Sequence, residues 1–85
     1  SAELRAGADL LSRLEDGAVI VVGSSLFFAP DVTPEMIMDK HLLFIVGAVA
    51  VCPKPLLGTV QANSIVGNMV MDEEAYEAFR KKYKV

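Results

Sequence analysis

Apolar residues occur in short runs that are each interrupted by a glycine, and the pattern recurs three times. The runs cover residues 19–30, 43–53 and 63–72. Their glycines lie 24 and then 20 residues apart, at Gly23, Gly47 and Gly67. β-Branched and aromatic residues on both sides of a glycine favour extended backbone, and glycine permits a corner or bulge between two strands. The pattern therefore predicts a strand–glycine–strand unit repeated three times.

Residues around the glycine predict how neighbouring units align. Val22, Val46 and Val66 each precede the glycine and should stack across parallel strands, as should Val21, Ile45 and Ile65. Beyond the glycine we allow the first unit one extra residue at Ser24–Ser25. Alternation then gives one inward face made of Leu26 and Phe28, Val49 and Val51, and Met69 and Met71. Gly47 should lie in a corner with positive φ or in a close backbone contact.

A helix signal follows the second strand of each unit. In the first unit, Thr33 is the expected N-cap and Pro34 the first helical residue. In the second, the prolines of residues 53–55 precede a short helix that runs from Leu56 to Ala62. In the third, Asp72 should cap a helix that extends through Tyr83.

The last helix carries an apolar stripe that should close the stack of units. Ala75, Phe79 and Tyr83 recur at four-residue spacing and are expected to face inward. Phe79 and Tyr83 should then be largely buried, while Arg80, Lys81 and Lys82 remain exposed. Basic residues in this last turn are also favoured by the helix dipole.

The segment before the first unit is predicted to be a helix over residues 2–14, ended by Glu15-Asp16-Gly17. In each predicted unit the helix follows its two strands, so the strands that belong to this first helix would precede Ser1. The chain is therefore expected to be a fragment of a longer array or to self-associate. In both cases the apolar edge of residues 19–29 would be covered, in the second case by a twofold-related copy.

These elements predict a single α/β repeat domain over residues 1–85, with parallel strands and helical returns. Residues 1–16 form the helix of a preceding unit, residues 17–41 and 42–62 the first two repeats, and residues 63–85 the third repeat and cap. With strand residues such as Leu43-Phe44-Ile45-Val46-Gly47, the arrangement resembles a divergent leucine-rich-repeat solenoid. Valines and a glycine stand where that family has leucines followed by asparagine or cysteine. The resemblance therefore implies an architecture and no functional residues.

Composition and charge limit the kinds of partner that the chain is expected to bind. Hydrophobic residues make up 53% of the chain, more than a small interior readily holds, which indicates apolar surface that a partner covers. The net charge is −3, and the basic cluster of residues 80–84 lies at a helix end, so we expect no nucleic-acid partner. The longest apolar run, residues 42–52, is shorter than the roughly 20 residues of a membrane span. A single cysteine fits a reducing, cytoplasmic setting.

Candidate reactive residues are few and carry no catalytic pattern. Ser24 and Ser25 follow a strand but lack the lysine and further glycines of a phosphate loop. His41 has no evident catalytic partner, and Cys52 follows a strand that should be buried. We expect no catalytic, cofactor or metal site. The favoured function is a non-catalytic module for protein–protein interaction or self-assembly, including a homodimer through the N-terminal edge. The alternative is a small α/β enzyme or ligand-binding domain that uses Ser24 and Ser25, His41 or Cys52.

Overall fold

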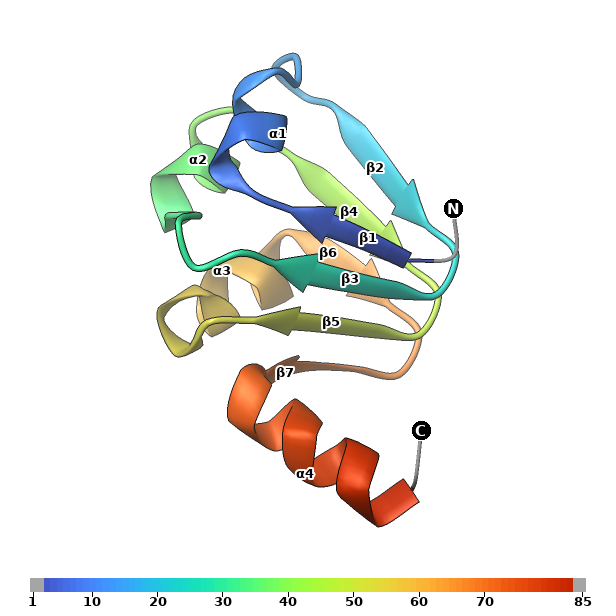
Figure 1. The fold of residues 1–85 in the computed structure, drawn as a ribbon. Helices are drawn as coiled ribbons and strands as arrows, with labels where there is room; N and C mark the ends of the chain where they lie inside the picture. Colours follow the sequence, from blue (N-terminus) through green and yellow to red (C-terminus); the bar gives the residue numbers. More distant parts are fainter. Residues whose placement is uncertain (1–2, 84–85) are drawn as a thin grey trace.

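Parallel strands in two facing sheets dominate the computed structural model, which describes residues 3–83 (Figure 1). One sheet has the order β1 (Glu3–Ala6), β3 (Ser25–Phe28), β5 (Val49–Cys52) and β7 (Met69–Asp72). The other has the order β2 (Val19–Val22), β4 (Leu43–Val46) and β6 (Ser64–Val66). Each unit therefore contributes one strand to each sheet, and a corner joins the two strands.

Short helices return the chain from one unit to the next. They are α1 (Ala8–Ser12), α2 (Pro34–Met38), and α3 (Leu57–Ala62) after a 3₁₀ turn over Lys54–Leu56. These three helices stack on one another at the end of the sheets opposite the corners, each burying an apolar side chain: Leu11, Ile37 and Val60 (Figure 1). The longer α4 (Glu73–Tyr83) follows β7 directly and lies apart from them. None of the helices in residues 3–83 is long and apolar enough to cross a membrane.

The predicted ladders before the glycine are confirmed. Val22 pairs with Val46, which pairs with Val66, and all of these strands run parallel. Val21, Ile45 and Ile65 form the neighbouring row in the same register. The α/β class with parallel strands therefore follows from the repeated pattern of the sequence.

Gly47 makes the close backbone contact that was one of its two predicted roles. A Cβ atom at Gly47 would lie 2.0 Å from the carbonyl oxygen of Gly23, and one at Gly67 would lie 2.1 Å from that of Gly47. The backbone N–H of Gly47 donates to the carbonyl of Val22 at 2.9 Å. Among the described residues, positive φ occurs instead at Gly17 and His41. The corners thus need glycine for space rather than for a left-handed backbone.

The predicted alignment beyond the glycine is wrong. Ser25 pairs with Val49, and Val49 pairs with Met69, so the first unit holds no extra residue. The N–H of Ala48 donates to Ser24 and that of Asn68 to Ala48, both at 2.8 Å, so every corner has the same length. The inward residues are consequently Leu26, Ala50 and Val70, which pair across the sheet, whereas the predicted inward residues of β5 and β7 point outward.

The core lies between the two sheets and the three short helices. Phe28 and Phe44 meet across it edge to face, with ring centroids 5.1 Å apart. Leu26, Ala50 and Cys52 are fully buried on the inward side of the larger sheet. Because Val51 pairs with Phe27, Cys52 takes the place in its unit that Phe28 has in the first unit.

The N-terminal helix prediction is wrong in its first half. Residues 3–6 form strand β1, in which Leu4 pairs with Leu26, and α1 begins only after Gly7. The alternation of Leu4 and Ala6 with Glu3 and Arg5 suits a sheet with one apolar face, so pairing with β3 outweighs local helix propensity. The described chain therefore holds one strand of the preceding unit, and β1 covers the edge of β3. Ala2, which the prediction included, lies outside the described residues.

The burial predicted for the last helix is also wrong. Asp72 does cap it, accepting a hydrogen bond from the N–H of Ala75 at 2.7 Å, and Arg80, Lys81 and Lys82 are exposed as expected. However, α4 has no buried residue: Phe79 is half-buried and Tyr83 is 57% exposed. The helix leaves β7 without a loop and packs on the outward side chains of the larger sheet, which require cover because they are apolar.

Candidate interaction surface

The outer face of the larger sheet is covered by the chain itself. Val49, Val51 and Met71 point outward yet are buried, because Tyr76 and Phe79 of α4 pack against them. Tyr76 also meets Phe27 of β3 edge to face, with centroids 5.3 Å apart. As a result all four residues of β5 are buried, so this strand has cover on both sides.

The outer face of the smaller sheet has no such cover within residues 3–83. Its outward side chains are Val19, Val21, Leu43, Ile45 and Ile65, and we call this set the uncovered face. Val21 is 70% exposed, Ile65 63%, Val19 55% and Ile45 36%. None of the residues in β2, β4 and β6 is charged. An exposed row of β-branched side chains without charge is typical of a surface that contacts another molecule.

The two strands at the N-terminal edge differ in their protection. β1 is the edge strand of the larger sheet and carries Glu3 and Arg5 on its outward side. β2 is the edge strand of the smaller sheet and reads Val-Ile-Val-Val. Charged side chains discourage an edge from pairing with another chain, so β1 is protected and β2 is not.

Lys40 joins α1 to the segment that follows α2 through three hydrogen bonds. The Nζ atom of Lys40 donates to the carbonyl oxygens of Leu11, Ser12 and Leu14, at 3.1, 2.7 and 2.8 Å. A cation at this position is favoured by the carbonyls at the C-terminal end of α1 and in the loop that follows it. Lys40 follows α2, so these bonds join one unit to the preceding one.

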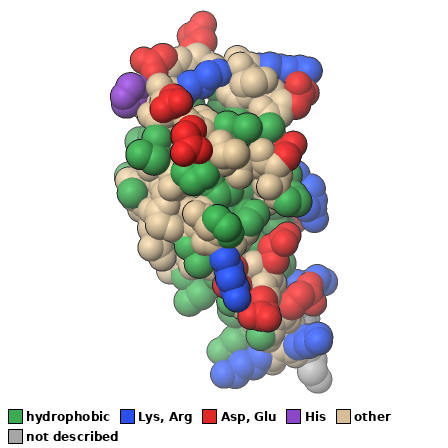
Figure 2. Space-filling model, turned by 90° about the vertical axis from the view of Figure 1, so that its left-hand side faces the viewer, with side chains coloured by type: hydrophobic (Ala, Val, Ile, Leu, Met, Phe, Trp, Pro, Cys, Tyr) green, Lys and Arg blue, Asp and Glu red, His purple; other side chains and the backbone are tan. Residues whose placement is uncertain are grey.

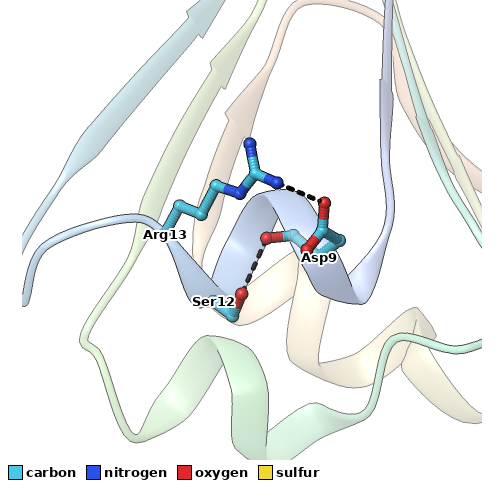
Figure 3. Close-up of polar contacts among 3 residues, drawn as sticks. All are labelled: Asp9, Ser12 and Arg13. Atoms are coloured by element: carbon cyan, nitrogen blue, oxygen red, sulfur yellow. Dashed lines mark hydrogen bonds and ion pairs between the residues drawn. The ribbon is translucent and has the colours of Figure 1, made fainter.

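Polar side chains within α1 and at its C-terminal end also contact one another. Arg13 binds the carboxylate of Asp9 at 2.9 Å, and the hydroxyl of Ser12 donates to the carbonyl of Asp9 at 2.7 Å (Figure 3). Figure 2 views this helical end and shows apolar side chains interspersed with charged ones, with acidic and basic residues crowded on α4 at the bottom. A cavity of about 390 Å³ lies between α1 and α2, beside Lys40. The ammonium of Lys40 is already bound by three carbonyls, so this cavity offers little to an anion.

A second hollow of about 340 Å³ lies between α4 and the larger sheet. Arg5 lies 5.0 Å from the centre of the Phe27 ring, and Arg80 lies 5.9 Å from that of Tyr76. Glu73 and Glu77 line the same hollow. These charged and aromatic side chains hold α4 against the larger sheet. Because the hollow has both acidic and basic side chains, it favours neither an anionic nor a cationic ligand.

The structure does not bring the candidate reactive residues together. Ser24 and Ser25 lie at the corner that follows β2, with their hydroxyl oxygens 3.4 Å apart. His41 lies ahead of β4, which runs parallel to β2. The two serines and His41 are therefore at opposite ends of the smaller sheet, separated by the strand length of about 13 Å. Cys52 is fully buried in the core, and burial raises the pKa of its thiol to about 11, so it remains a protonated thiol at neutral pH.

His41 is instead part of an exposed ion pair. Its Nδ1 lies 3.0 Å from a carboxylate oxygen of Asp16, in the loop ahead of β2. The hydrogen bond to Asp16 and then the charge of Asp16 raise the pKa of His41. Its backbone has φ 52°, a left-handed conformation that a non-glycine residue seldom adopts. The pair joins the loops before β2 and β4.

The described residues 3–83 contain no group of three or more His, Cys, Asp or Glu side chains placed to hold a metal ion. Comparisons with known proteins found no matching family model, no matching curated protein and no matching solved structure.

Sequence reasoning missed two features of this surface. Val21, Ile45 and Ile65 were identified as a row, but their inward neighbours are equally apolar, so the pattern gave no sign of which row faces solvent. The three bonds of Lys40 had no local signal at all, because their acceptors are backbone carbonyls 26 to 29 residues away.

Proposed function

We propose that this chain is a non-catalytic repeat module that associates with protein, and in the first place with a second copy of itself through its N-terminal edge. In this proposal the repeated strand–corner–strand–helix units form a short solenoid of the leucine-rich-repeat kind. Repeat arrays of this type present extended surfaces to partners. The separation of Ser24, His41 and Cys52 supports the non-catalytic alternative over the enzymatic one.

The unprotected edge of β2 carries the proposal. Its four residues are apolar, and Val19 and Val21 are more than half exposed. Its neighbour β1 carries Glu3 and Arg5, so pairing at the edge is favoured in the smaller sheet. A twofold axis would set β2 antiparallel to β2 of the second copy and join the two three-stranded sheets into one of six strands.

Sedimentation velocity across micromolar concentrations tests this association. We expect the unaltered chain to form a dimer and Val21→Lys to be monomeric, because two lysines would face each other across the antiparallel pair. Ile65→Lys is the matched control: it adds the same charge to the same face, but on β6, two strands or about 10 Å from the edge. A monomeric unaltered chain, or equal dissociation by both variants, would contradict pairing through β2.

A further inference from the structure

We infer that the uncovered face docks an amphipathic helix of a partner protein, with the apolar stripe of that helix lying over Val21, Ile45 and Ile65. This inference goes beyond the proposed pairing of β2, because it concerns the outward side chains of three strands and not the backbone of the edge.

The other sheet shows what kind of structure fits such a face. Its outward Val49, Val51 and Met71 are buried by two aromatic residues of one helix, Tyr76 and Phe79, three positions apart. Parallel sheets generally have both faces covered, most often by helices. The uncovered face carries the same kinds of side chain on the same kind of parallel sheet. A helix that presents apolar residues at three- and four-residue spacing would therefore cover it in the same way.

The size of the face matches that of a single helix. Three strands span about 10 Å, and four residues along a strand span about 13 Å. A helix with its side chains is about 10–12 Å wide, so one helix covers the width of the face. Val21, Ile45 and Ile65 lie in one register across the three strands, so a single helix can contact all three.

Charge around the face adds a preference for the partner. The strands contribute no charge, but Glu15 and Asp16 lie exposed just ahead of β2. At the same end His41 pairs with Asp16, and Lys40 has its ammonium bound to backbone carbonyls, which leaves the exposed carboxylates of Glu15 and Asp39. The end of the face nearest residues 15 and 16 is thus acidic, and the opposite end, at Ser24, Ala48 and Asn68, is neutral. A helix with lysine or arginine in one terminal turn complements this arrangement.

Titration of the ¹⁵N-labelled full chain with a synthetic helix tests the inference by NMR. The probe is a peptide of about 18 residues, long enough to form a helix on binding, with leucines along one face and lysines in its first and last turns. We expect amide shifts along β2, β4 and β6 and none along β3 and β5. A second peptide with glutamates in place of those lysines should bind more weakly, and its loss of affinity should diminish at high salt. Shifts confined to β3, β5 or α4, or no shifts, would overturn the inference.

Paired variants separate the face from the edge. Ile65→Asn should weaken binding of the lysine peptide at least about tenfold while leaving the dimer intact. Met38→Asn, at an exposed apolar residue of α2, is the control and should leave binding unchanged. Ile65→Ser serves as a second variant should Ile65→Asn not give a folded spectrum. Undiminished binding to both Ile65 variants would exclude the face, and a dimer that Ile65→Asn dissociates would assign the face to a second copy instead.

Discussion

Both sheets carry apolar side chains on their outer faces, yet within residues 3–83 only the larger sheet has a helix packed on that face. Val49 and Val51 of β5 and Met71 of β7 lie beneath Tyr76 and Phe79, whereas the outward residues of β2, β4 and β6 contact solvent. Core packing between the sheets does not require either set. The difference shows that the high apolar content of the chain has two separate origins: one part serves the fold through α4, and the other part remains available for contact with another molecule.

Substitution of Gly47 should have the largest effect, because it disturbs both sheets at once. In Gly47→Ala the new Cβ atom would meet the carbonyl oxygen of Gly23 at 2.0 Å, and that oxygen belongs to backbone that cannot yield without moving a corner. We expect a loss of more than about 3 kcal/mol in the free energy of unfolding, measured by urea denaturation.

Gly58→Ala is the matched control for that substitution. A Cβ atom at Gly58 meets nothing within 4 Å, and the residue lies in α3, where alanine favours the helix by roughly 0.5–1 kcal/mol. The two variants should therefore shift stability in opposite directions. Equal stability of the two variants would show that the corners tolerate a side chain.

Substitutions of the aromatic residues that cover the larger sheet should lower stability by an intermediate amount, whereas substitutions on the uncovered face should leave it nearly unchanged. Tyr76→Ala and Phe79→Ala should each cost about 1–2 kcal/mol, less than the 3–5 kcal/mol of a fully buried ring, since both side chains are half-buried. Val21→Thr and Ile65→Thr, which change the uncovered face, should remain within about 0.5 kcal/mol of the unaltered chain. Thermal unfolding of dilute monomer compares the four variants. Equal losses on both faces would mean that the uncovered face contributes to the fold as α4 does.

The ion pair between His41 and Asp16 should give the smallest effect, visible as a pH dependence. The folded-state pKa of His41 is raised, so its contribution to stability is present below the ordinary pKa near 6.5 and is lost as pH rises through the folded value. Urea midpoints measured between pH 5 and 8 should fall slightly over this interval in the unaltered chain. In Asp16→Asn the slope should flatten, and an unchanged slope would assign the pH dependence to other groups.

Much of the repeat could be predicted because identical residue types recur at equivalent places. Val22, Val46 and Val66, each followed by glycine, defined the units and the parallel pairing. The register beyond the corner could not be predicted, since Leu26, Phe27 and Phe28 are all apolar and alternation gives no phase. Backbone hydrogen bonds between Ala48 and Ser24 decided it, and these leave no trace in the residue pattern.

The remaining errors have the same physical origin. Glu3 to Ala6 was assigned to a helix because Leu4, Leu11 and Leu14 would share one helical face, but pairing with β3 decides its conformation. The stripe of α4 was expected to face the main core, yet the outward Val51 and Met71 created a second place for it to pack. An exposed apolar edge was predicted over residues 19–29. In the structure β2 is such an edge, but β1 covers β3, and the uncovered face was not predicted.

The regular spacing of the strand pairs has a consequence for how the molecule assembles. Every parallel pair joins residues 20 to 24 positions apart, so each pairing closes a loop of nearly the same length at nearly the same cost in chain entropy. Strands pair only with those of adjacent units, so order can spread from a central pair to its neighbours one unit at a time. Amide hydrogen exchange should then be slowest in β4 and β5 and progressively faster toward β2 and β6, as fraying from both ends precedes complete opening.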